Sequence, residues 1–93
     1  MRLEFDPAKS ERNARERGLP FERTEHFEWR SAIVAADVRR DYGETRLVAT
    51  GLLDGRLHVL CFSRIDDGIR VISLRKANRR EVMEYGQAKA ADE

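Results

Sequence analysis

An Asp-Gly pair at residues 54 and 55 constrains the fold of this chain more than any other feature of the sequence. A tight two-residue turn of the primed type needs positive φ at both central residues, which Asp and Gly accept at low cost. The flanking segments, residues 46–53 and 56–64, are rich in apolar residues. The pair therefore predicts a β-hairpin in which these two segments are antiparallel neighbours.

The segments around this hairpin predict an α+β fold. Pro7 and Pro20 indicate helix starts, because proline at the first helical position loses no hydrogen bond, and Gly18 is a natural helix end. The expected elements are, in chain order, a short strand at 3–5, helices at 7–17 and 20–29, strands at 31–38, 46–53, 56–64 and 69–74, and a docked helix at 77–89. This order predicts a four-stranded, largely antiparallel sheet with helices on one side and its last strand in the centre.

Length and residue usage limit the class of protein. At 93 residues the chain is expected to form one domain over residues 1–93. Cys61 is the only cysteine and the two histidines are far apart in the sequence, so no disulfide, metal site or cofactor is predicted. The N-terminus lacks a signal-peptide core and no apolar run is as long as a membrane span. A cytoplasmic protein without membrane contact is predicted.

Charge is abundant but unevenly distributed. The chain has 18 Lys and Arg against 17 Asp and Glu, so its net charge of +1 does not by itself indicate a nucleic-acid partner. Residues 70–80 nevertheless carry only basic charges. This segment suits contact with phosphate, a solvated basic edge, or a docking surface for an acidic partner protein.

Four segments, in order along most of the chain, resemble the BrnT family of toxins from bacterial type II toxin-antitoxin pairs. They are LEFDPAK (residues 3–9) with Asn13 and Gly18; Phe21, Glu22 and Phe27; DYGETR (41–46); and GIRVISLRKA (68–77) with Arg79, Arg80, Glu81 and Tyr85. The resemblance implies a RelE-like ribonuclease that inhibits translation. It also implies neutralisation by a BrnA-like antitoxin in a hetero-oligomer that reaches operator DNA only through the antitoxin.

Cleavage of RNA without metal requires a deprotonated 2′-hydroxyl, a stabilised pentacoordinate phosphate and a protonated leaving oxygen. Arginine suits the second task, because its planar fork of donors matches phosphate oxygens. The predicted catalytic residues are Arg46, Arg64, Arg70, Ser73 and Arg75. Strict strand alternation puts Ser73 and Arg75 on one face and Arg70 on the other, so a bulge or a strand end must re-aim one of them.

Further residues are candidates for RNA binding or proton transfer, each with a structural alternative. The predicted RNA-binding residues are Lys9, Arg79, Arg80 and Tyr85. Lys9 and Asn13 share a helix face and could instead pair with nearby glutamates, and Tyr85 could be a core contact. Glu44 and Glu81 are candidate bases. His58 and His26 are expected to be structural, and Trp29 an anchor in the core or at a partner interface.

A second function is compatible with the same pattern. The basic segment would serve a binding module that associates with an antitoxin, and through it with operator DNA, without cutting RNA.

Overall fold

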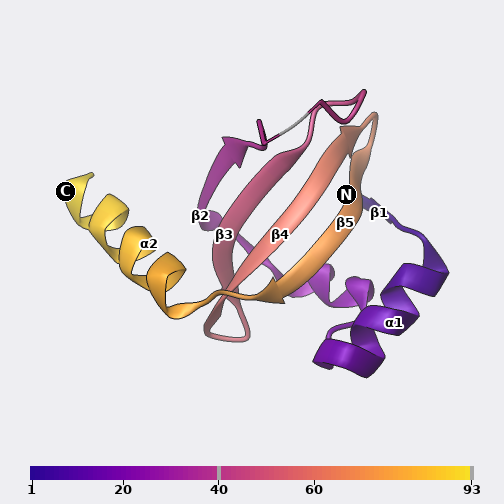
Figure 1. Ribbon diagram of the computed structural model, residues 1–93, viewed down its shortest axis with the longest axis horizontal. Helices are drawn as coiled ribbons and strands as arrows, with labels where there is room; N and C mark the ends of the chain where they lie inside the picture. The colour runs from indigo at the N-terminus through magenta and orange to yellow at the C-terminus, as the bar shows by residue number, and fades with distance from the viewer. Residues whose placement is uncertain (40, 93) are drawn as a thin grey trace.

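The computed structural model describes residues 1–39 and 41–92, and it confirms the predicted α+β fold (Figure 1). The elements are β1 (Arg2–Glu4), α1 (Pro7–Arg17), the 3-10 helix η1 (Phe21–His26), β2 (Glu28–Ala36), β3 (Leu47–Leu53), β4 (Arg56–Ile65), β5 (Gly68–Lys76) and α2 (Arg79–Ala91). The hairpin turn between β3 and β4 has the expected geometry, with φ of 54° at Asp54 and 76° at Gly55.

All the strands form one sheet in the order β1-β5-β4-β3-β2. β1 pairs with β5 in parallel and thereby adds a fifth strand to the four predicted ones, while the other pairs are antiparallel. The prediction that β5 is the central strand is wrong, because β4 occupies the middle and is buried from Leu57 to Ser63 on both faces. The apolar residues of β5 that suggested burial on both faces reflect a bulge in that strand instead.

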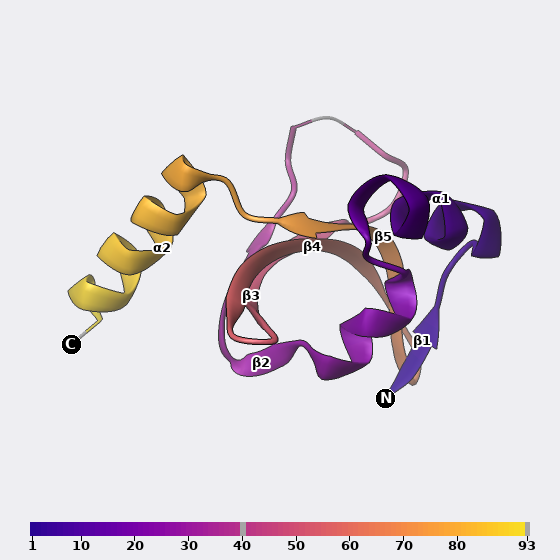
Figure 2. The same ribbon diagram turned by 90° about the horizontal axis from the view of Figure 1, so that it is seen from below.

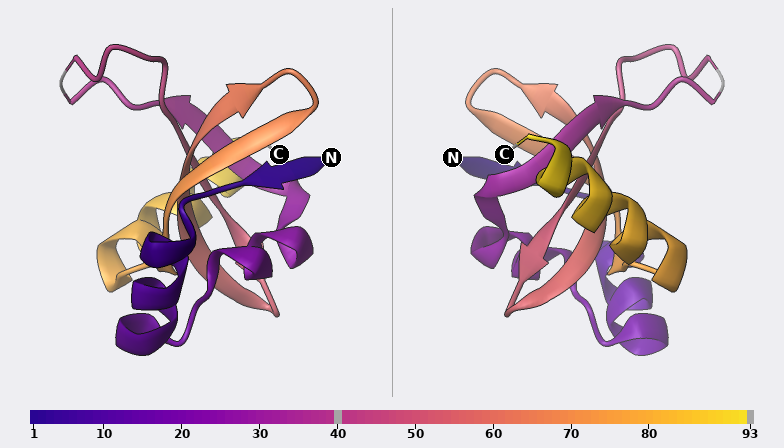
Figure 3. Two further views of the ribbon diagram at one scale, coloured as in Figure 1. Left: turned by 90° about the vertical axis from the view of Figure 1, so that its right-hand side faces the viewer. Right: turned by 90° about the vertical axis from the view of Figure 1, so that its left-hand side faces the viewer.

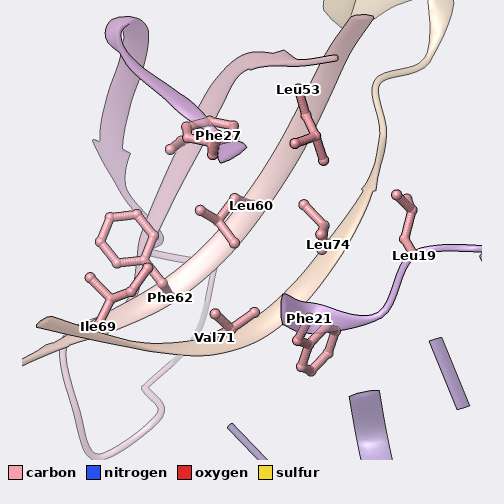
Figure 4. Close-up of a cluster of buried hydrophobic side chains, with 10 residues drawn as sticks. Leu19, Phe21, Phe27, Leu53, Leu60, Phe62, Ile69, Val71 and Leu74 are labelled. Carbon is pink, nitrogen blue, oxygen red and sulfur yellow. The ribbon is translucent and has the colours of Figure 1, made fainter. Parts of the chain in front are cut away.

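The sheet curves around η1 (Figure 2). The hydrophobic core fills its concave side. Leu60 of β4 and Leu74 of β5 are fully buried there beneath Phe21 and Phe27 (Figure 4). Trp29 lies in β2, not at the end of a helix, and its ring is 4.9 Å from that of Phe27. Trp29 is therefore a core anchor, one of the two roles predicted for it.

α2 lies outside the curve of the sheet, so the helices do not all cover one side as predicted (Figures 2 and 3). Asn78 and Glu81 form a capping box at its start. The Tyr85 hydroxyl donates to the Ser31 carbonyl of β2 at 2.8 Å. No residue of α2, which the structure describes in full, is buried, and Met83 is 59% exposed. The expected docked helix thus rests on the sheet through polar contacts more than through an apolar stripe.

Within the described residues, no helix has both the length and the apolar character to span a membrane.

Candidate functional site

A β-bulge in β5 decides which side chains share a face of the sheet. Cys61 of β4 lies opposite Ser73, whereas its neighbour Phe62 lies opposite Val71, so Ile72 is an extra residue in β5. One extra residue shifts the alternation of a strand by one position.

This shift places the predicted catalytic residues of β5 on one face of the sheet. Arg70, Ser73 and Arg75 lie opposite Ser63, Cys61 and Val59, which alternate along β4 and share one face. We call this face, on the side away from the core, the outer face. These residues can share a face only if β5 contains a bulge, and the structure contains that bulge.

The sequence contains a signal for this bulge. Ile69, Val71 and Leu74 all face the core, so their spacing changes from two residues to three. In the sequence, the adjacent apolar residues Val71 and Ile72 suggest a strand that is buried on both faces. A change of spacing inside a strand-like segment indicates a bulge equally well.

Arg75 is held in place by α2. Its Nη1 and Nη2 donate to the two carboxylate oxygens of Glu81 at 2.8 Å each. The hydrogen bond from Arg75 lowers the pKa of Glu81 to about 2, and the same bond raises the pKa of Arg75. Glu81 is therefore a poor proton acceptor, despite its place among the candidate bases.

A second arginine, which the sequence reasoning missed, projects from the segment after β2. Asp37 accepts hydrogen bonds from Arg39 Nε at 2.9 Å and Nη2 at 2.8 Å. The Asp37 side chain is only 1% exposed, and the bond from Arg39 lowers its pKa to about 2. The Asp-x-Arg spacing just after a predicted strand was the available signal, but nothing local relates it to Arg75.

A cavity of about 380 Å³ on the outer face brings these groups together. It is lined by Ala36, Asp37, Val38, Arg39, Val48, Val59, Cys61, Ser73, Arg75 and Glu81. Ser73 is exposed at its edge, while Cys61 is buried, and that burial raises the pKa of its thiol. The cavity thus combines arginine donors with an accessible hydroxyl.

α1 borders the same region from the other side. Lys9, Arg12 and Arg17 line a neighbouring cavity of about 250 Å³ that also includes Ser73. Asn13 is turned inward, and its Nδ2 donates to the carbonyls of Leu19 at 2.6 Å and Leu74 at 2.9 Å. Lys9 is therefore near Ser73, whereas Asn13 joins the helix to the sheet.

The remaining predicted catalytic residues lie towards the other end of β4. The Glu44 carboxylate stands between Arg46 Nε, at 3.6 Å, and Arg70 Nη1, at 3.5 Å. Arg64 lies opposite the buried Ile69, so it alternates with the outer-face residues. The structure gathers Arg46, Arg70, Ser73 and Arg75 on one face and leaves Arg64 off it.

The predicted RNA-binding residues of α2 lie beside the cavity and do not line it. Arg79 and Arg80 are exposed in the first turn, and Arg80 Nε is 3.6 Å from Glu84. Tyr85 lines an apolar groove against Ile33 and other residues of the outer face. Its ring is half-buried between α2 and β2, so a packing role describes it better than an open stacking platform.

The histidines lie apart from the site. His58 is buried, with Nδ1 2.7 Å from the Arg56 carbonyl, and His26 ends η1. No group of His, Cys, Asp and Glu among the described residues could hold a metal ion. The basic side chains that line the two cavities are Arg39 and Arg75 in one and Lys9, Arg12 and Arg17 in the other.

Comparison with known proteins points to one family. Neither the curated proteins nor the solved structures gave a match. A family model described as "Ribonuclease toxin, BrnT, of type II toxin-antitoxin system" matches residues 5–81, a range that includes Arg39, Arg46, Arg70 and Arg75. The chain belongs to the BrnT family of ribonuclease toxins of type II toxin-antitoxin systems.

Proposed function

We propose that this chain is an endoribonuclease that cleaves RNA on the outer face without a metal ion. The observation that carries the proposal is the Ile72 bulge, which puts Arg70, Ser73 and Arg75 on the same face. RNA would cross from the basic side of α1, past Ser73, to the cavity that contains Arg39. The scissile phosphate would lie in that cavity.

The chemistry follows from how the arginines are held. Arg39 and Arg75 are each bound by a carboxylate that occupies two of their nitrogens. A guanidinium has five N–H donors, so each keeps donors for phosphate oxygens. Because the two carboxylates fix them before substrate arrives, little reorganisation is needed when negative charge develops on the phosphate.

The Ser73 hydroxyl adds a neutral donor at the edge of the cavity. The attacking group is the 2′-hydroxyl of the RNA itself, so the protein needs no nucleophile of its own. The main contribution of this site is electrostatic stabilisation of the transition state, which in many enzymes accounts for most of the rate enhancement.

In the cell, cleavage of this kind would inhibit translation, and a BrnA-like antitoxin would neutralise it in a hetero-oligomer. We place the protein in the cytoplasm as a single RelE-like domain. Covering the outer face would exclude RNA, and the exposed edge of β2 offers a place for an added strand. Operator DNA would be contacted through the antitoxin.

The test compares Arg75→Ala with Arg15→Ala, measured as cleavage of RNA by purified protein in the presence of a chelator. Arg15 is an exposed arginine of α1 that pairs with Glu11 and lines neither cavity, so its loss removes the same charge outside the site. We expect Arg75→Ala to reduce the cleavage rate by about 10²–10³-fold, as removal of one transition-state donor does. In cells that express the protein, Arg70→Ala should relieve the growth arrest that the wild-type protein causes.

Because Arg75→Ala also frees α2, Arg75→Lys serves as a second variant. It keeps a charge beside Glu81 but loses the forked donor geometry, so folding should persist while cleavage stays low. Full toxicity of the folded Arg75 variants would contradict the assignment.

A catalytically degenerate binding module is the alternative. It is favoured by two observations: both cavity arginines are already bound to carboxylates, and the described residues that line the cavity include no histidine. Wild-type protein that binds RNA in chelator without cutting it would establish this alternative.

A further inference from the structure

Two buried polar atoms on the outer face have no hydrogen-bond partner within the part of the chain that the structure describes. They are Arg46 Nε and Ser63 Oγ. Ser63 is only 4% exposed. Buried polar groups are nearly always paired, so two neighbouring donors without partners indicate a missing acceptor.

The residues that carry these two atoms stand in one row with Arg70, across β5, β4 and the residue just before β3. Ser63 of β4 lies opposite Arg70 of β5, and Arg46 immediately precedes Leu47, which lies opposite Phe62. Arg46, Ser63 and Arg70 therefore stand side by side on the outer face. We call them the Arg46 row.

Glu44 stands where an acceptor would be, but it does not satisfy the donors. Its carboxylate oxygens are 3.6 Å from Arg46 Nε and 3.5 Å from Arg70 Nη1, beyond good hydrogen-bond distance. Glu44 compensates the positive charge of the row but does not accept hydrogen bonds from its unpaired donors. Arg70 Nε is bound separately to Glu4 at 2.7 Å.

The row is also held in position and borders open space. The Arg46 guanidinium lies over the Tyr42 ring, 4.0 Å from its centroid, which fixes its plane. Ser63 of the row and Glu44 border a cavity of about 170 Å³, which is also lined by Thr45, Leu47 and Arg64. An anion could therefore enter when the Glu44 side chain, 38% exposed, turns away.

We propose that the Arg46 row is a second phosphate subsite, for a phosphodiester of single-stranded RNA away from the bond that is cut, and that Glu44 occupies its anion position until RNA arrives. The ligand's identity as RNA rests on the proposed function. Ser63 is four residues from Val59 along β4, roughly 13 Å, so this phosphate is distinct from the one beside Arg75. Forked guanidiniums and a hydroxyl match the several oxygens of a phosphate better than they match one carboxylate.

The experiment measures binding of a labelled, mixed-sequence 2′-O-methyl RNA oligomer, which lacks the attacking hydroxyl and stays intact. Glu44→Gln should bind it more tightly, by on the order of tenfold at low salt, because a competing anion is gone. Arg46→Ala should bind it about tenfold more weakly, with the salt slope reduced by about one. Arg15→Ala is the matched control for loss of charge.

Ser63→Ala is the second variant, since it removes one unpaired donor without disturbing the strands. It should weaken binding severalfold, about what a single lost hydrogen bond to a charged group costs. Unchanged binding in Glu44→Gln together with Arg46→Ala behaving like Arg15→Ala would overturn the subsite.

Two further outcomes also overturn it. Loss of RNA cleavage in Glu44→Gln with unchanged binding would make Glu44 a catalytic base. Competition at the row by an acidic peptide, with no effect of these variants on RNA, would assign it to a protein partner. Wild-type protein that binds the oligomer through the row and cleaves no RNA would defeat the proposed function alone.

Discussion

The Asn13 side chain shows how one amide joins distant parts of this chain. Its Nδ2 donates to the carbonyl of Leu19, after α1, and to that of Leu74 in β5. These bonds set the position of α1 against β5 and thus bring Lys9 and Arg12 to the side of Ser73. A residue that looked able to contact RNA is instead what positions the residues that line the site.

Replacing Asn13 should destabilise the protein without removing any charge from the site. Asn13→Ala leaves two carbonyls without their donor, and we expect a loss of about 1–3 kcal/mol in the free energy of unfolding, measured in urea. Asn13→Asp should be at least as harmful, because a carboxylate would face two carbonyl oxygens. Lys9→Ala, which truncates an exposed side chain of the same helix, should leave the unfolding midpoint unchanged, and equal effects at both positions would refute this role.

At the scale of elements, the attachment of β1 depends on the absence of a side chain in its neighbour. β1 pairs with β5 over only three residues, and Gly68 lies opposite Arg2. A Cβ atom on Gly68 would lie 1.8 Å from the Arg2 carbonyl oxygen. Since that oxygen is backbone, the strand itself would have to move.

Gly68→Ala should therefore displace β1, whereas Gly86→Ala in α2 provides a matched control. A Cβ at Gly86 meets nothing within 4 Å, and alanine in a helix interior is favoured over glycine by up to about 1 kcal/mol. We expect faster amide exchange in β1 and a lower melting temperature for the first variant, and an unchanged or higher melting temperature for the second. Equal melting temperatures would show that β1 contributes little.

At the scale of the whole molecule, the two faces of the sheet have different tasks. The concave side, which curves around η1 in Figure 2, holds the core, and the outer face holds the arginines. An ion pair between Arg75 and Glu81 joins α2 to the outer face, whereas Asp37 and Arg39 pair within the segment after β2 and fix the Arg39 side chain at the cavity. The site should therefore respond to pH while the core does not.

Acid should loosen α2 and free the Arg39 side chain from Asp37. Asp37 and Glu81 both have a folded-state pKa of about 2, below ordinary values of 3.8 and 4.5, because arginines bind the charged forms. Their stabilising contribution is fully present above about pH 4.5 and is lost as the pH falls towards 2. Hydrogen exchange in α2 should accelerate over this window, and Glu81→Gln should remove most of the pH dependence there. If Glu81→Gln showed the same acceleration of exchange at low pH as the wild-type protein, this explanation would be contradicted.

Several features follow from the sequence because their causes are local. The Asp54-Gly55 turn, the start of α1 at Pro7 and its end at Gly18 depend on backbone preferences of the residues themselves. The pairing of β3 with β4 follows from the turn between them. The family resemblance likewise rests on ordered segments, and the family model confirms it over residues 5–81.

Other features depended on contacts between residues far apart in the chain, which only the tertiary structure decided. β1 joins the sheet beside β5 because the curved sheet leaves that edge open, and no local pattern states this. Arg39 reaches the cavity of Arg75 because residues 37–39, which follow β2, lie at the outer face. The bulge at Ile72 was readable as a change of spacing, but its register against Cys61 had to come from the pairing of β4 with β5. Residue types determined which groups could bind phosphate, and strand register determined which of them share a face.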